Sequence, residues 1–153
     1  MRVIDDTDRR ILRLLQKEGR ISLSELAERV GLGATATSDR LRRLQRDSYV
    51  LGFGARLNPA LLGRGLLVFI EVRLERTTPD VFESFAQTVR RAPEVLECHM
   101  VAGGFDYLLK TRVEDMAAYR RFLAEVLLAL PGVRETHTFA VMEEVKATAE
   151  LPI

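Results

Sequence analysis

Three groups of residues in this 153-residue chain have side chains and spacings that could do chemistry. The first is Cys98-His99, a thiol next to a base. Adjacent side chains on a β-strand point to opposite faces of the sheet, so the imidazole cannot activate the thiol there. We therefore interpret Cys98 as a small apolar residue of a core or an interface, and we predict that the protein is not an enzyme.

The second group is a run of arginines at positions 40, 42, 43 and 46, with no acidic residue inside it. Residues 1–63 carry 12 basic and 8 acidic side chains, a net charge of +4, whereas residues 64–153 carry 11 and 14, a net charge of −3. A basic part joined to a mildly acidic part indicates a polyanion-binding module attached to a second domain. A solvated helix face is the alternative interpretation of the run.

The third group is the segment Gly103-Gly104-Phe105-Asp106, which joins two expected strands. Glycines leave backbone N–H groups accessible to a carboxylate, and the Asp106 carboxylate can pair with an ammonium group. An α-amino acid requires both of these contacts. Because no helix follows the segment, it differs from the phosphate-binding glycine motifs. A tight turn without a ligand is the alternative.

The composition excludes several classes of protein. Hydrophobic residues make up 47% of the chain and charged residues 29%, with a net charge of +1, which argues against disorder. No apolar stretch approaches the roughly 20 residues that span a bilayer, and the N-terminus does not resemble a secretory leader. One cysteine and two histidines cannot build an ordinary zinc site, so we expect no metal and no cofactor. We expect a cytoplasmic protein without membrane contact.

Apolar residues at helical spacing predict three short helices near the N-terminus. The first begins at Asp5 or Asp6, the second opens with a Ser-x-x-Glu capping box at Ser22 and ends at Gly31, and the third spans about 34–46. Two short helices joined by a tight glycine-bearing turn, the second rich in arginine, form a helix-turn-helix. A three-helix bundle that only dimerises is the alternative.

The third helix is the predicted DNA-reading helix, because its N-terminal residues would enter the major groove of double-stranded DNA. Its hydroxyl side chains can bond base edges or phosphates, and its arginines can bond phosphates. Asp39 could accept from a cytosine, although capping or a pair with Arg43 is the simpler interpretation. The predicted DNA-binding residues are Thr35, Ala36, Ser38, Asp39, Arg42, Arg43 and Arg46.

The hydrophobic period changes to two after residue 64. The expected elements from there on are a strand, a helix, two strands, a helix and a last strand over 133–145, which is the ferredoxin-like β-α-β-β-α-β order. We therefore predict an α+β protein with a winged helix-turn-helix domain over 1–57, including a short hairpin over 49–57, a linker over 58–64 and a ferredoxin-like domain over 65–153. Apolar residues on both faces of the first strand indicate a homodimer.

Several stretches resemble the Lrp/AsnC (feast/famine) family of transcription regulators. They include residues 4–12, 105–113, 130–133 and 141–146, and the resemblance runs from about Ile4 to Pro152. It implies a regulator of amino-acid metabolism genes whose dimers assemble into octamers or larger discs that wrap DNA. It also implies a small effector, usually an amino acid such as leucine, that binds between dimers.

Carried over residue by residue, the resemblance implies that the effector site consists of Met100, Gly103, Gly104, Asp106, Met116, Phe139, Ala140 and Val141. The chain departs from the family in two places. Most relatives have Ser-Pro where this chain has Gly33-Ala34, and close relatives of the leucine-responsive branch often have Tyr where this chain has Phe139. An architectural DNA-wrapping protein without an effector is one alternative function, and a small-molecule enzyme or carrier is another.

Overall fold

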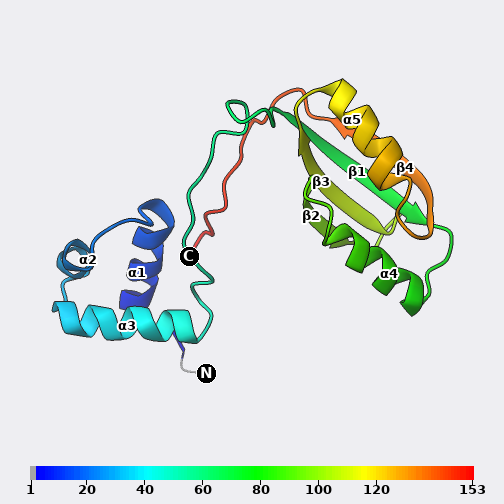
Figure 1. The fold of residues 1–153 in the computed structure, drawn as a ribbon. Coiled ribbons are helices and arrows are strands. Elements are labelled where there is room, and N and C mark those ends of the chain that lie inside the picture. The colour runs from blue at the N-terminus through cyan, green and yellow to red at the C-terminus, as the bar shows by residue number, and fades with distance from the viewer. Residues whose placement is uncertain (1–2) are drawn as a thin grey trace. The chain divides into compact units, whose positions relative to one another are not determined.

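The chain divides into two compact units in a computed structural model that describes residues 3–153 (Figure 1). The N-terminal unit consists of the residues up to Arg56 together with Lys146–Ile153, and the C-terminal unit is Leu57–Val145. This corrects the predicted 65–153 domain, because the last eight residues pack on the N-terminal unit. The Gln16 side-chain amide donates to the Leu151 carbonyl over 3.1 Å and accepts from the Leu151 N–H over 2.6 Å.

The N-terminal unit is a bundle of three helices, α1 (Asp6–Lys17), α2 (Leu23–Val30) and α3 (Ala34–Arg46). A capping box starts α1, since the Asp8 N–H donates to Asp5 over 2.8 Å and the Asp5 N–H donates to Asp8 over 3.1 Å. Gly31 ends α2 at a φ of 71°, in the left-handed region that favours glycine. The small core of this unit contains Ile11, Leu12, Leu26, Val30 and Leu44.

The segment that follows α3 differs from the prediction. No strand forms between Arg46 and Leu66 in this described part of the chain, so the expected hairpin over 49–57 is absent from a single copy. Leu51 is 93% exposed and Leu57 is also exposed. These two leucines do not pack against a core, and Gly52 and Gly54 have no side chains that could pack. Strand pairing in this segment would therefore gain no apolar burial within the chain.

The C-terminal unit has the predicted β-α-β-β-α-β order. Its strands are β1 (Leu66–Leu74), β2 (Val95–Met100), β3 (Tyr107–Val113) and β4 (Val133–Ala140), and they form one antiparallel sheet in the order β2-β3-β1-β4. Its helices are α4 (Pro79–Val89) and α5 (Met116–Phe122), the latter continuing as a π-helical turn, η1 (Leu123–Leu127). The last strand therefore ends five residues earlier than predicted.

Both helices pack on one face of the sheet (Figure 1). Val68, Ile70 and Val72 of β1 are fully buried beneath them. Phe85 of α4 stacks on Tyr107 of β3 with ring centroids 4.4 Å apart. The core of this unit contains 13 buried residues, against five in the N-terminal unit, so apolar burial dominates its stability.

The opposite face of the sheet is more charged than predicted. β3 places Lys110 opposite Phe69 and Arg112 opposite Leu67, so the apolar residues of β1 alternate with cations across the sheet. Lys110 lies 2.8 Å from the Glu97 carboxylate, and Arg112 lies 2.6 Å from that of Glu144. The register between β1 and β3 could not be read from the separate sequences of the two strands.

Candidate functional site

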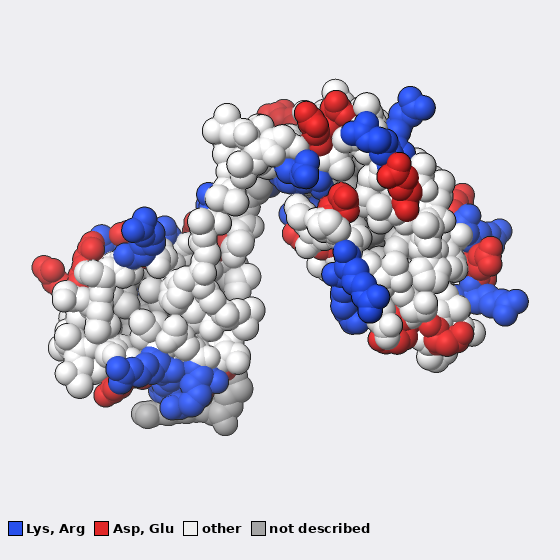
Figure 2. All heavy atoms as spheres, in the orientation of Figure 1, with Lys and Arg blue, Asp and Glu red and all other residues white. Residues whose placement is uncertain are grey.

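The outward face of α3 presents most of the predicted DNA-binding residues. Thr35, Ala36, Asp39, Arg42 and Arg46 are exposed, and Ser38 is half-buried. Figure 2 shows Lys and Arg side chains gathered on the α3 side of the N-terminal unit. The outward face of α3 therefore presents hydroxyl groups and two exposed arginines to solvent.

Arg43 is the exception among the predicted DNA-binding residues. Its guanidinium pairs with the fully buried carboxylate of Asp8, and its side chain is only 17% exposed. The helical spacing places Arg43 on the side of α3 that faces α1, one residue away from the exposed Arg42. This geometry corrects the expectation that Arg43 is free to bind a phosphate.

Arg40 belongs to the same internal group. Its guanidinium lies 2.7 Å from Asp5 and 2.8 Å from Asp8, so it bridges the two acids that cap α1. The hydrogen bond from Arg40, followed by that from the Asp8 N–H, lowers the pKa of the Asp5 carboxyl to about 2. The Asp5 carboxyl is therefore ionised at neutral pH.

Asp39 also has a partner other than the one expected. Its carboxylate lies 3.8 Å from Arg42, three residues later, rather than against Arg43 four residues later. Both side chains are more than two-thirds exposed, so this ion pair is weak. Water therefore competes for this pair on the exposed face of α3.

The loop between β2 and β3 is tied to the end of β1. Asp106 Oδ2 accepts from the Leu74 N–H over 2.7 Å, and the Asp106 N–H donates to the Val72 carbonyl over 3.0 Å. The Arg73 guanidinium donates to the Gly104 carbonyl. In residues 3–153, the second oxygen of Asp106 accepts no hydrogen bond. Asp106 therefore attaches the loop to the end of β1.

The predicted effector residues fall into two groups at opposite ends of the sheet. Met100 lies opposite Tyr107, which lies opposite Val72 near the end of β1, and the loop with Gly103, Gly104 and Asp106 continues from there. Ala140 lies opposite Val68 near the start of β1, with Phe139 and Val141 beside it.

Met116 belongs to the second of these groups. It opens α5 just after Val113, which lies opposite Leu66 at the start of β1. The six residue steps from Leu66 to Val72 extend over about 20 Å at the usual rise of a strand. One chain therefore does not bring both groups around one small ligand.

Cys98 and His99 lie on opposite faces of β2, as predicted. Cys98 packs against the core beneath the helices, and burial raises the pKa of its thiol to about 11. The His99 imidazole lies 3.2 Å from Glu97 on the other face. A thiol with so high a pKa stays protonated at neutral pH and is a poor nucleophile.

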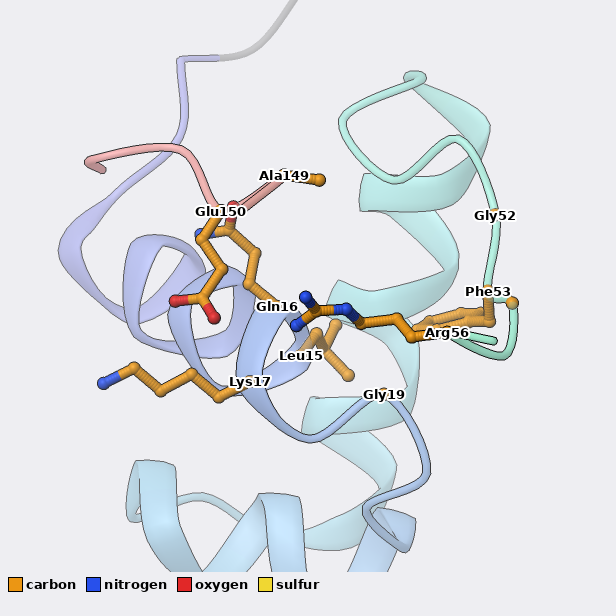
Figure 3. A pocket seen from close by; sticks show the side chains of 10 residues that line it. Leu15, Gln16, Lys17, Gly19, Gly52, Phe53, Arg56, Ala149 and Glu150 are labelled. Atoms are coloured by element: carbon orange, nitrogen blue, oxygen red, sulfur yellow. The ribbon is translucent and has the colours of Figure 1, made fainter. Parts of the chain in front are cut away.

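Two open cavities in the N-terminal unit were not predicted. One of about 350 Å³ lies between α1, the segment around Phe53 and the C-terminal residues Ala149 and Glu150, with the Arg56 side chain extending across it toward Gln16 (Figure 3). The other, of about 610 Å³, is lined mainly by apolar side chains that include Leu51 and Ile153. None of the predicted DNA-binding or effector residues lines either cavity.

The residues that sequence reasoning missed are those that hold α3 in place. Asp5 was expected only as a cap, and Asp8 and Arg40 were not assigned to any site. The spacing Asp5-x-x-Asp8 was a usable signal, because two acids at the N-terminus of a helix leave charge that an arginine of a neighbouring helix can neutralise. Which arginine does so depends on how the helices cross.

The described residues include neither a membrane-spanning helix nor a cluster of metal ligands. In residues 3–153, no helix combines the length and the apolar character that crossing a membrane requires. Within the same range, no three side chains of His, Cys, Asp or Glu are placed to share a metal ion.

Comparison with known domains identifies both units. Residues 4–50 match the family of winged helix-turn-helix DNA-binding domains, and residues 67–151 match the Lrp/AsnC ligand-binding domain. The second match alone covers more than half of the chain. The two families together account for the basic three-helix unit and for the ferredoxin-like unit described above.

Individual relatives match nearly the whole chain. The chain is 55% identical over 150 residues to the leucine-responsive regulatory protein of Escherichia coli, with 98% of this chain and 92% of the relative covered. A transcriptional regulator from Neisseria meningitidis, solved as a complex with L-Met, is 39% identical with a TM-score of 0.93, covering 98% of this chain and 97% of that one. An AsnC-family regulator from Agrobacterium tumefaciens is 32% identical with a TM-score of 0.93, each chain being covered to 97%.

Proposed function

This chain belongs to the Lrp/AsnC family of transcription regulators, and on that premise we propose that an amino acid controls its binding to specific DNA sites near amino-acid metabolism genes. It carries a DNA-binding helix-turn-helix domain and a ligand-binding domain. The proposal extends this to the residues that make each contact, to the class of effector and to action in the cytoplasm. The single observation that supports the proposal is that one chain contains both a DNA-binding domain and a ligand-binding domain.

For DNA, the proposed contacts are made by the outward face of α3. Thr35 and Ser38 lie in the first turns of the helix, where they reach base edges, and Arg42 and Arg46 lie further along, where they reach phosphates. Both arginines are more than two-thirds exposed, and their carboxylate neighbours Asp39 and Asp47 hold them only at 3.8 and 3.3 Å. They are therefore available for phosphates without the loss of a strong internal contact.

For the effector, the proposed site lies between two copies of the chain. Residues of the Gly103–Asp106 loop come from one copy, and Met116 with Phe139–Val141 comes from another, because one chain holds the two groups at opposite ends of its sheet. The backbone of the loop faces the carboxylate of an amino acid, and the free oxygen of Asp106 faces its ammonium. Met116 and Phe139 are half-exposed apolar side chains that an aliphatic or thioether side chain would cover.

The identity of the effector depends on that apolar group. The Neisseria meningitidis relative was solved with L-Met, and the curated relatives are called leucine-responsive. Phe139 offers no hydroxyl for a polar side chain, so we propose a medium-sized apolar amino acid of the leucine or methionine type. Such a ligand changes DNA binding only by binding one assembly or dimer geometry more tightly than another.

The proposal is tested by fluorescence anisotropy of the purified protein on DNA from upstream of its own gene and on a scrambled fragment of the same length. We expect tighter binding to the upstream DNA and a shift in affinity with leucine or methionine, but not with aspartate or lysine. Equal affinity for both fragments would instead favour the architectural, DNA-wrapping alternative.

The shared site is tested by mixing two variants. Gly103→Glu alters the loop group and Ala140→Glu alters the strand group; Gly103 has open space around it and Ala140 is exposed, so the unit still folds. Each variant alone is expected to lose the amino-acid response, because the added carboxylate repels that of the ligand. Co-assembled from a denatured mixture, the two variants form some sites with both native halves, and part of the response returns. No recovery in the mixture would contradict a site between copies.

A further inference from the structure

The four arginines of α3 form two pairs: two are exposed to solvent, and two contact the buried carboxylate of Asp8. Arg42 and Arg46 are exposed, whereas Arg40 and Arg43 turn toward α1 and meet Asp8. We propose that Asp8 is a positioning residue for DNA recognition, which fixes the orientation of α3 and keeps Arg40 and Arg43 away from the phosphates. This inference rests on the proposed contact between the outer face of α3 and DNA.

The geometry around Asp8 is that of a complete internal network. The Asp8 side chain is fully buried, with Oδ1 2.8 Å from Arg40 and Oδ2 paired with Arg43. Oδ2 also accepts from the Asp5 N–H, and the Asp5 carboxylate lies 2.7 Å from Arg40. No buried side-chain N or O atom lacks a partner in the part of the chain that the structure describes. The N-cap residue Asp5 and Asp8 of the first turn of α1 therefore neutralise two cations of α3.

The burial of Asp8 determines whether Arg40 and Arg43 pair with this carboxylate or with a DNA phosphate. A carboxylate removed from water is stable only when it is paired, and separating one partner from a buried pair leaves an uncompensated charge. A DNA phosphate, approached from solvent, does not supply Asp8 with a replacement cation. Arg43 and Arg40 therefore remain with Asp8 when DNA binds, whereas Arg42 and Arg46 lose only weak, exposed partners.

The division has a consequence for sequence recognition. Each cation that contacts a phosphate adds affinity for any DNA sequence, and it steepens the fall of log affinity with log salt by about 0.9. Because Arg40 and Arg43 stay paired with Asp8, they add no such non-specific affinity. Their ion pairs instead fix the angle at which α3 presents Thr35 and Ser38, on which contacts with base edges depend. Asp8 therefore favours specific over non-specific binding.

The test replaces Asp8 by its neutral isostere, Asp8→Asn, in the full-length protein. The matched control is Asp6→Asn, which removes the same charge from the same turn of α1; Asp6 is exposed, and no ion pair found in residues 3–153 includes it. Affinities for the upstream and the scrambled fragments are measured by anisotropy over a fourfold range of salt.

We expect Asp8→Asn to release Arg43 toward the phosphates. Relative to Asp6→Asn, its salt slope on scrambled DNA becomes steeper by about 0.9, which means an extra three- to fourfold loss of affinity across the salt range. Its ratio of specific to non-specific affinity falls. A purely structural role would lower the fraction of folded protein without changing this slope, so equal slopes for Asp8→Asn and Asp6→Asn would overturn the inference.

A second pair of variants keeps the test decisive if Asp8→Asn does not fold. Arg43→Gln and Arg42→Gln remove neighbouring charges of one helix, and only Arg42 is free to meet a phosphate in the native protein. We expect Arg42→Gln to reduce the salt slope by about 0.9 and Arg43→Gln to leave it unchanged. Equal reductions in both variants would show that Arg43 contacts DNA and would overturn the inference. Failure of the native protein to prefer upstream DNA would instead overturn the proposed function from which the inference starts.

Discussion

The two units of this protein hold their binding surfaces in place by different means. In the N-terminal unit, a core of five buried apolar residues is supplemented by a capping box, a buried ion-pair network and a docked C-terminal segment. In the C-terminal unit, 13 buried apolar residues lie between a sheet and two helices, and its ion pairs lie on the opposite face or at the surface. The orientation of α3 therefore depends on these polar contacts as well as on the buried Leu44, whereas the Gly103–Asp106 loop is attached to a sheet with a larger apolar core.

This difference predicts different sensitivities. Polar contacts respond to charge and pH, whereas apolar packing responds to volume. Four substitutions or conditions test this contrast.

The largest effect is expected in the apolar core of the C-terminal unit. Phe85→Ala removes a fully buried ring that stacks on Tyr107, so it should lower the free energy of unfolding of this unit by about 3–5 kcal/mol. Urea unfolding followed by circular dichroism measures the loss. Leu128→Ala, at an exposed site next to the π-helical turn, is the control and should cost less than about 1 kcal/mol. Similar losses in both variants would mean that this core does not dominate stability.

A smaller effect is expected where the C-terminal segment docks. Gln16→Ala removes both hydrogen bonds to Leu151 and should cost the N-terminal unit about 1 kcal/mol. It should also make residues 146–153 easier to cleave in limited proteolysis read by mass spectrometry. Lys17→Ala changes an exposed neighbour on the same helix and serves as the control. If cleavage is equally fast in both variants, the segment is not held by Gln16.

Acid should weaken the N-terminal unit through Asp5. The pKa of this carboxyl is about 2 in the folded protein against an ordinary 3.8, so its stabilising contribution is complete above pH of about 4 and is lost as the pH falls toward about 2. Because Asp5 is exposed, solvent and salt screen the effect. The measurement compares thermal unfolding midpoints at the two ends of this pH range in Asp5→Asn and the native protein. Asparagine still caps the helix, so an equal acid shift in both proteins would contradict a role for the charge.

The smallest effect is expected at the start of α3. Gly33 has extended backbone and makes no side-chain cap, and within residues 3–153 no atom outside its chain neighbours lies within 4 Å of the point that a Cβ would occupy. A serine therefore fits there without strain. Gly33→Ser should raise the free energy of unfolding by a few tenths of a kcal/mol, because its hydroxyl accepts from a free N–H of the first turn. Gly52→Ser, in an open position outside any helix, should give no such gain. A loss of stability in Gly33→Ser would mean that the glycine is required.

Much of this architecture was predictable because it depends on local patterns. The caps at Asp5 and Ser22, the glycine stop at Gly31 and the period-two strands follow from contacts within a few residues. The order of the elements then led to both domain folds. Boundaries were less predictable: the predicted helix over 115–130 is α5 followed by a π-helical turn, since the last turns depend on packing against the sheet.

The candidate sites were predictable only in part. Helical spacing separated Arg42 and Arg46 from the buried Leu44, but it could not say that Arg43 would meet Asp8, 35 residues earlier in the chain. The Gly103–Asp106 loop was identified from its composition, yet the use of one Asp106 oxygen by the Leu74 N–H depends on the pairing of β1 with β3. The expected hairpin over 49–57 does not form in a single copy, because an alternating pattern gives a stable strand only when further strands or a helix pack with it.

The amino-acid sequence by itself determined the family, the two folds and most of the exposed face of α3, because these follow from residue types repeated at short spacing. Only the tertiary structure decided that two arginines of α3 pair with Asp8 of α1, that residues 146–153 pack on the N-terminal unit and that the predicted effector residues lie at opposite ends of one sheet. These three features join residues that are distant in the chain. Their contacts form only when helix crossing and strand register are set, and packing sets both.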